Sequence, residues 1–363
     1  MAYMRLSWRL YNFAVPSPKI QYTDAMSIWR QFLQRLGLVE AELPASPVPF
    51  PQPAAGQPEQ ITRKVLQIVF DPLMPPQMGR RLSQVMGWQD VDRLTAGYIQ
   101  DLLTASHGNL AYRVVEKILA DEFPLKADGF AYTGEAYTRA MRAHSGFHQP
   151  DGVDYDKILE DYHLVERINS GSIDEVWLFG MPYAGFYESR MAGPGAFFCN
   201  APPLEAPGAN RRFILMGFSY ERGVGEMLED FGHRAEFTLA RAYQNVPAQS
   251  NLWARFTRYD KTSHGRAECG TVHYAPNSRI DYDWGNPKAV TCACRNWASF
   301  PDLSAPPLKL NCAEWGNGDI RRHHVWWLSL FPHVNGQSDG VAWNWWAYLA
   351  DPNFNFGEGQ ELS

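Results

Sequence analysis

Carboxylate side chains and one imidazole lie at regular intervals along one predicted helix, over residues 224–242. Glu226, Glu229, His233 and Glu236 are three, four and three residues apart, so an α-helix places all four on one side. The pair Glu229 and His233 has the spacing with which one helix presents two ligands to a divalent ion. We therefore expect Glu229, His233 and Glu236 as candidate metal ligands. The alternative is the solvent-exposed side of an amphipathic helix.

A second group of candidate residues occupies the loop over residues 180–195, which is rich in glycine. Glycine lets a backbone approach a ligand closely, and the loop also offers Tyr183 and Tyr187 as binding groups. Glu188 is a candidate general acid or base, and Arg190 can hold an anionic or polyol group. The alternative is that Glu188 and Arg190 pair with each other and brace the loop.

Tryptophan is concentrated near the C-terminus, where nine of the thirteen lie between Trp253 and Trp346. Flat rings stack on the faces of sugars, so Trp315 and Trp345 are candidates for the wall of a glycan-binding cleft. The alternative is that these rings fill a hydrophobic core, because aromatic side chains bury large areas. The same segment contains further candidate ligands or acid–base groups, and the alternative for each is a structural role: His273, Glu314, His324 and His333.

The elements that must position these residues follow from the hydrophobic pattern. Short apolar runs predict four buried strands, at 65–70, 111–118, 175–179 and 213–216. Helical periodicity lies between and after them, at 90–105, 154–169 and 224–242. This alternation predicts an α/β fold with a mostly parallel, doubly wound sheet.

Ligands of an open parallel sheet bind beyond the carboxyl ends of its strands. Asp71 follows the first predicted strand, the 180–195 loop follows the third, and the helix over 224–242 follows the fourth. We therefore expect these three segments to open onto one cleft, with Asp71 as a further substrate-binding candidate.

Composition divides the chain into three parts. Residues 1–60 combine a helix predicted over 27–38 with a proline-rich arm that has five prolines between positions 43 and 53. Residues 61–245 form the expected α/β core, and residues 246–363 an aromatic-rich, loop-rich segment packed on it. The arm is a candidate contact to a neighbouring subunit in a homo-oligomer.

Overall charge and missing motifs exclude several classes of function. The chain has 33 Lys and Arg against 39 Asp and Glu, a formal charge of −6, which argues against a nucleic-acid partner. No apolar run approaches the roughly 18 residues of a membrane span. Glycine-rich dinucleotide and phosphate loops, calcium-binding EF-hand loops and the His-Glu-x-x-His order of zinc peptidases are all absent.

The sequence is compatible with more than one cellular compartment. Arg5 and Arg9 interrupt what would be the apolar part of a signal peptide, so we expect a cytoplasmic chain, or an extracellular one if a leader has been removed. The five cysteines are an odd number, which predicts either buried free thiols or one or two disulfides in the C-terminal part.

Several longer strings resemble a bacterial protein family, often secreted, that is uncharacterised. They are FDPLMPPQMGRRL at 70–82, VWLFGMPYAGFYESRMAGPGAF at 176–197, GHRAE at 232–236, WWLSLFPH at 326–333 and NWWAYLADPN at 344–353. The resemblance implies one integrated domain over 61–353 and slightly favours an extracellular setting. It implies no activity, cofactor or catalytic residue.

Three functions agree with these features. The first is a hydrolase with a glycan as its leading substrate class, in which Glu188 and either Glu226 or Glu229 supply the carboxylate pair that glycoside cleavage requires, and His233 tunes or ligates. The second is a metal-dependent hydrolase of amide or ester bonds that uses Glu229, His233 and Glu236, with His273 or His333 as a candidate further ligand. The third is a non-catalytic cell-surface protein that binds glycan or assembles.

Overall fold

The computed structural model describes residues 58–74 and 79–354 of the 363-residue chain. The helix expected over 27–38 and the proline-rich arm at 43–53 lie outside the described residues. Among the helices that are described, none has the length and apolar character needed to cross a membrane.

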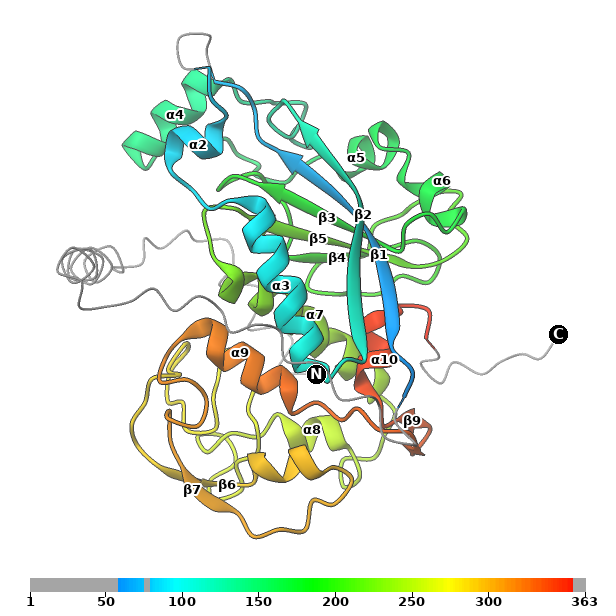
Figure 1. Ribbon diagram of the computed structural model, residues 1–363, viewed down its shortest axis with the longest axis vertical. Coiled ribbons are helices and arrows are strands. Elements are labelled where there is room, and N and C mark those ends of the chain that lie inside the picture. The colour runs from blue at the N-terminus through cyan, green and yellow to red at the C-terminus, as the bar shows by residue number, and fades with distance from the viewer. Residues whose placement is uncertain (1–57, 75–78, 355–363) are drawn as a thin grey trace. The chain divides into compact units, whose positions relative to one another are not determined.

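A five-stranded sheet lies in the upper part of the view in Figure 1, above the yellow and orange C-terminal segment. Its strand order is β2-β1-β3-β5-β4. The parallel strands are β1 (Ile61–Phe70), β2 (Leu110–Ala120), β3 (Glu175–Gly180) and β5 (Phe213–Ser219), and β4 (Ser189–Ala192) pairs antiparallel with β5 at one edge. The expected mixed α/β fold with a mostly parallel sheet is confirmed.

Helices cover both faces of the sheet. One face packs against α3 (Val91–Ala105) and α7 (Val224–Ala242), and the opposite face packs against α5 (Tyr155–Asp161) and α6 (Leu164–Asn169). Successive residues of β3 alternate between the two hydrophobic clusters, with Trp177 on the side of α3 and α7. Burial on both faces explains the continuous apolar runs of β3, of β5 and of the second half of β1.

The expected helices over 90–105 and 224–242 correspond to α3 and α7. The helix expected over 154–169 is divided, because α5 ends at Asp161 and α6 begins at Leu164. His163 lies between them with a φ of 50°, a left-handed conformation that an α-helix of L-residues cannot contain.

Several further elements were not predicted from the sequence. Most of them are shorter than the roughly 10–12 residues over which helical periodicity becomes readable. They are the helices α2 (Leu82–Met86), α4 (Gly134–Ala143), α8 (Leu252–Phe256), α9 (Ile320–Ser329) and α10 (Trp345–Ala350), and the strand pairs β6 (Val290–Cys292) with β7 (Leu308–Leu310) and β8 (Gln337–Ser338) with β9 (Val341–Ala342).

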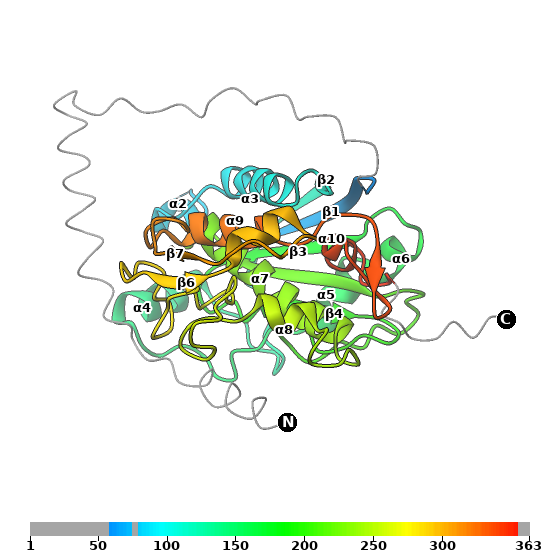
Figure 2. The ribbon, with the colours of Figure 1, turned by 90° about the horizontal axis from the view of Figure 1, so that it is seen from below.

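Aromatic rings of the C-terminal segment form a dense cluster beside α7. Neighbouring ring centroids lie between 4.8 and 6.3 Å apart, mostly edge to face, which is the favoured geometry of aromatic pairs. The cluster contains Trp253, Phe256, Trp297, Trp327, Phe331 and Trp345. It is continuous with the core between the sheet and α3 and α7, and Figure 2 shows this segment in yellow and orange alongside α7.

The C-terminal segment also contacts the beginnings of the first two strands. The ring of His333 stacks on that of His107, which precedes β2, with centroids 4.0 Å apart. Arg63, near the start of β1, forms a 2.8 Å ion pair with Asp351. These contacts join the aromatic segment to the end of the sheet at which β1 and β2 begin.

All five cysteines are buried free thiols: Cys199, Cys269, Cys292, Cys294 and Cys312. The closest pair is Cys292 and Cys294, whose sulfur atoms lie 3.4 Å apart. The alternative of disulfide bonds in the C-terminal part therefore has no counterpart among the described residues.

A buried ion pair fastens α7 to the centre of the sheet. Arg234 is 1% exposed, and its guanidinium lies 2.8 Å from Oε1 of Glu175 on β3. Trp177 and Tyr112 donate hydrogen bonds to the same carboxylate, at 2.9 and 3.2 Å. Arg234 also donates to the carbonyl oxygen of Leu349 in α10, at 2.6 Å. One network thus links β2, β3, α7 and α10.

We expect Arg234→Met to lower the free energy of unfolding by about 3–5 kcal/mol, because it leaves the Glu175 carboxylate buried without its counter-ion. The double variant Arg234→Met/Glu175→Gln should lose less than the sum of the two single losses. Urea denaturation followed by tryptophan fluorescence measures both. Arg139→Gln, which removes an exposed ion pair with Glu135, is the control and should change little. A loss below about 1 kcal/mol for Arg234→Met would contradict the structural role of the pair.

Candidate metal centre

Three potential metal ligands converge beside α7. Glu229 and His233 come from the helix, and His273 comes from the loop that follows α8. One ligand atom of each lies within 4.8 Å of the others. His273 Nε2 is 2.9 Å from Glu229 Oε1 and 3.1 Å from His233 Nε2. Ligand atoms bound at 2.0–2.1 Å around a tetrahedral ion lie roughly 3.3 Å apart, so these separations suit one small divalent ion.

Each imidazole is backed by a carboxylate on its other nitrogen. His233 Nδ1 lies 3.2 Å from Glu236 Oε2, and His273 Nδ1 lies 3.1 Å from Asp281 Oδ1. Donation of an Nδ1 proton to each carboxylate fixes the tautomer that presents the Nε2 lone pair. Metal-bound histidines in proteins almost always have such an outer partner, which also makes the ligand more basic.

The third ligand, Glu229, is held from a different side. Its side chain is buried, and Oε1 accepts a 2.8 Å hydrogen bond from the hydroxyl of Tyr282. Tyr282 has a φ of 59°, a conformation that is rare for an aromatic residue and that turns the loop back toward α7. The loop from His273 to Tyr282 therefore contributes a ligand, a carboxylate behind that ligand and a hydroxyl group.

The approach of this loop to α7 depends on a glycine. Gly232 lies in α7 next to His233, and a Cβ placed on it would meet Val272 Cγ2 at 2.6 Å. Only a residue without a side chain lets Val272, and with it His273, come this close to the helix. The backbone N–H of Val272 also donates a 3.1 Å hydrogen bond to Glu236 Oε1, which fastens the loop to the helix one turn further on.

The pKa values of His273 and Glu229 are shifted in opposite directions, so that a proton between the two side chains stays on His273. Burial by itself would lower the pKa of His273, but hydrogen bonds to Asp281 and Glu229, with their charges, outweigh it and raise the pKa to about 10. Burial would raise the pKa of Glu229, but the hydrogen bond from His273, neighbouring imidazoles and Tyr282 lower it to about 2. At neutral pH the pair therefore carries a proton on His273 and a negative charge on Glu229.

The neighbouring His324 contributes no positive charge at neutral pH. Burial lowers its pKa to about 4, and its Nε2 hydrogen-bonds to the carbonyl oxygen of Val272 at 3.2 Å. This bond supports the backbone directly before His273. His324 thus supports the loop that carries His273.

The predicted acidic residues have several different roles. Glu236 lies behind His233 and is not among the three clustered ligand atoms. Glu226 accepts a hydrogen bond from the N–H of Gly223 and caps the start of α7. Glu188 is partly buried and accepts a hydrogen bond from Asn200. Burial lowers the pKa of His233, but the hydrogen bond and charge of Glu236, with a further contribution from the charge of Glu188, raise it above its usual value.

Asp71 lies away from the three ligands. It accepts hydrogen bonds from the backbone N–H and the hydroxyl of Ser83, at 2.9 and 2.6 Å, and so fastens the start of α2. A cavity of about 570 Å³ near the end of β1 is lined by Met74 and residues of α4, and its lining includes neither Asp71 nor Glu229.

The predicted loop residues bind one another and their surroundings. Tyr183 stacks on Phe147 with ring centroids 3.6 Å apart, and Tyr187 is exposed. The guanidinium of Arg190 lies over the ring of Tyr155 and donates to the carbonyl oxygen of Pro202 at 2.9 Å. These contacts make Arg190 a brace of the loop, through partners other than Glu188.

The aromatic and C-terminal candidates are not at the centre. Trp315 and Trp345 are both 0% exposed, so neither offers a ring face to a ligand. Glu314 pairs with Arg295. His333 stacks on His107, as described above.

Asp281 and Tyr282 were not predicted as site residues. They lie in a loop without periodicity, where nothing in the sequence shows which side chains turn back toward α7. The only available signal was the acidic pair Asp281 and Asp283 a short distance after His273.

Comparison with protein-family models, curated proteins and solved structures found no match to this chain. The class of protein is therefore defined by its own features, an α/β fold with a cluster of one carboxylate and two imidazoles on the flank of α7.

We expect Gly232→Ala to lower the affinity for added zinc, used as a probe ion for this cluster, at least about tenfold, because the new methyl group displaces Val272 and with it His273. Competition with a chromophoric chelator measures the affinity. The double variant Gly232→Ala/Val272→Ala removes the conflicting Cγ atoms and should recover part of the loss. Unchanged affinity in Gly232→Ala would show that the close approach is not needed for the centre.

In the metal-free protein, the stabilisation contributed by His273 should be lost as pH rises. The folded-state pKa of about 10 exceeds the usual 6.5, so the contribution is complete below pH 6.5 and disappears as pH passes 10. The difference in free energy of unfolding between wild type and His273→Gln should narrow by up to about 1.4 kcal/mol per pH unit in this window. Urea denaturation in a chelator across this range measures it, and a constant difference would contradict the shared proton.

Proposed function

We propose that this protein is a metal-dependent hydrolase of amide or ester bonds, with a single divalent ion held by Glu229, His233 and His273. The observation that carries the proposal is the convergence of these three ligand atoms, with a carboxylate behind each imidazole. A solvent-exposed helix face would not explain this convergence, because Glu229 and His233 are each only 7% exposed.

Zinc is the metal that this ligand set favours. Catalytic zinc sites use three protein ligands, two histidines and a glutamate among them, and leave a further position for water or substrate. A zinc ion in such a site polarises a carbonyl group and lowers the pKa of bound water to about 7. The chain's own residues then bind the ion, orient the imidazoles and accept a proton.

Glu188 is the proposed general base. Its carboxylate acts electrostatically on His233 and on Asp230, whose pKa is raised by burial and by the charges of Glu188 and Glu229. A partly exposed carboxylate beside a metal site suits proton abstraction from water. Asp230, as the carboxyl group that stays protonated to higher pH, is a candidate proton donor to the leaving group.

A glycan substrate receives less support from the structure. Glu226 is engaged as a helix cap, and Trp315 and Trp345 are buried, so the expected aromatic cleft lacks these members. A non-catalytic glycan-binding surface would depend on the rings of the same two tryptophans, so it also receives less support. We keep glycosides in the experiment below as the competing substrate class, and a homo-oligomer assembled through the proline-rich arm stays a prediction.

We also propose that the core is doubly wound. The order β2-β1-β3-β5 with helices on both faces supports this topology. The metal ligands lie on the flank of the helix after β5 and on a distant loop, so the centre does not depend on the strand-end loops alone.

Elemental analysis of the purified full chain tests the metal centre. We expect about one zinc per chain in the wild type and loss of the metal in His233→Ala and His273→Ala, because two ligands hold a divalent ion far less tightly than three. His264→Ala, at a side chain that is 90% exposed, is the matched control and should keep the metal. Absence of a divalent metal after reconstitution overturns the proposal, and iron in place of zinc overturns its hydrolytic part.

Activity on a panel of aryl esters, aminoacyl anilides and aryl glycosides tests the reaction class. We expect ester or anilide cleavage that a chelator abolishes and zinc restores. Glu188→Gln should lower kcat by about 10²–10⁴-fold while the zinc content stays unchanged. Glycoside cleavage that survives the chelator would instead support the carboxylate-pair mechanism.

A further inference from the structure

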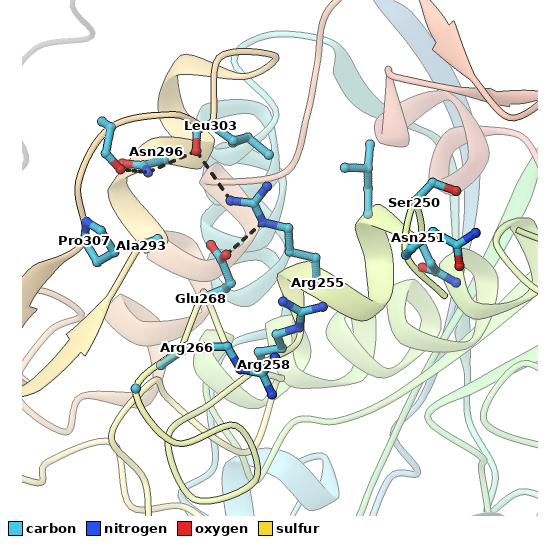
Figure 3. A pocket seen from close by; sticks show the side chains of 15 residues that line it. Ser250, Asn251, Arg255, Arg258, Arg266, Glu268, Ala293, Asn296, Leu303 and Pro307 are labelled. Carbon is cyan, nitrogen blue, oxygen red and sulfur yellow. Dashed lines mark hydrogen bonds and ion pairs between the residues drawn. The ribbon is translucent and has the colours of Figure 1, made fainter. Parts of the chain in front are cut away.

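A second site lies in the C-terminal segment, away from the metal ligands. It is a surface pocket of about 470 Å³, within the size range of small-molecule sites. Four stretches of chain line it: the start of α8, the segment over 265–268, the 3₁₀-helix over Cys294–Ser299 with the residue before it, and the loop over 303–307 (Figure 3). None of the three metal ligands belongs to its lining.

The charge of the pocket is strongly one-sided. Its lining contains the three arginines Arg255, Arg258 and Arg266 and a single acidic residue, Glu268. Arg255 donates to Glu268 Oε1 at 2.8 Å, and Glu268 Oε2 accepts from Trp297 Nε1 at 2.9 Å. The one carboxylate is therefore fully used, and it neutralises one arginine of three.

The other two arginines keep their donors available. Within the part of the chain that the structure describes, the guanidinium groups of Arg258 and Arg266 form neither a hydrogen bond nor an ion pair. Figure 3 shows them next to each other, near Arg255 and Glu268. Each guanidinium offers five N–H donors in a planar fork that matches a phosphate or carboxylate group.

Backbone hydrogen bonds join the chain at Arg258 to the segment that carries Arg266. The carbonyl oxygen of Arg258 accepts from the N–H groups of Glu268 and Gly270, at 3.0 and 3.2 Å. Arg258 and the segment that carries Arg266 and Glu268 are thus joined by paired backbone, which places the two arginines on adjoining stretches of chain. Two like charges held together in the absence of an anion repel each other, and an anion between them relieves that repulsion.

The rest of the lining suits an organic group. Leu252, Leu303, Ala293, Ala305 and Pro307 supply apolar surface. The amide of Asn296 is engaged with the carbonyl oxygens of Leu303 and Ala305, so it shapes the wall. We propose that this pocket binds a small organic phosphate monoester, with the dianionic phosphate on Arg258 and Arg266 and the organic group against the apolar wall.

Isothermal titration of the full chain with phenyl phosphate at low salt tests the site, with inorganic phosphate and benzyl alcohol as partial ligands. We expect one site for phenyl phosphate, weaker binding of inorganic phosphate, none of benzyl alcohol, and weakening by added salt. Arg258→Gln and Arg266→Gln should each weaken binding at least about tenfold, because each removes a charged hydrogen-bond partner.

Two control variants separate this site from its surroundings. Arg113→Gln, at an exposed arginine on β2, should leave the affinity unchanged. His273→Ala, which removes one of the proposed metal ligands, should also leave the affinity for phenyl phosphate unchanged. Loss of binding in this variant would show that the phosphate binds to a metal ion instead. The proposal is overturned by absence of saturable binding, by equal affinity in Arg258→Gln/Arg266→Gln and wild type, or by loss of binding in His273→Ala. Equal affinity for inorganic phosphate and phenyl phosphate would overturn the organic part of the assignment.

Discussion

The buried ion pair between Arg234 and Glu175 is the interaction on which the arrangement of this molecule depends. It joins α7 to β3, the strand in the middle of the sheet, and Arg234 extends the connection to α10. Arg234 directly follows His233, and consecutive residues of a helix point about 100° apart. The same turn of α7 therefore anchors the helix through Arg234 and carries His233, a proposed metal ligand, so the depth and rotation of the helix determine where Glu229 and His233 lie.

The second requirement is the close contact between α7 and the loop that begins at Val272. His273 is 44 residues beyond Glu229, and its approach depends on the missing side chain of Gly232 and on the hydrogen bond from Val272 to Glu236. Glu236 serves two functions, since one of its oxygens holds the loop and the other holds His233. Its position on the same helix face as the ligands, which suggested a ligand in the sequence, is explained by this supporting role.

The regular part of the fold could be predicted from the sequence, because burial on both faces of a parallel sheet leaves continuous apolar runs and amphipathic helices leave a 3.6-residue period. α7 was predicted with its observed bounds for that reason, and the division at His163 was missed because a single left-handed residue leaves no trace in the periodicity. The site was only half predictable. Glu229 and His233 share a helix and a readable spacing, whereas Asp281 and Tyr282 reach the centre through a turn whose shape depends on tertiary contacts. The number of tryptophans could not show whether their rings fill a core or line a cleft, because both uses favour the same side chain. Trp315 and Trp345 are in fact fully buried.

The charges around the two imidazoles explain why a divalent cation suits this centre. Glu229, Glu236 and Asp281 together carry −3, and they surround His233 and His273 within hydrogen-bonding distance. A divalent ion bound by two neutral imidazoles brings two positive charges to these carboxylates, whereas a proton on one imidazole brings only one. A proton and a metal ion therefore compete for the same Nε2 atoms, and the ion compensates more of the carboxylate charge in a partly desolvated place. The carboxylates behind both imidazoles lie within hydrogen-bonding distance of the Nδ1 atoms, so a cation on the Nε2 side would find the outer partner of each histidine in place.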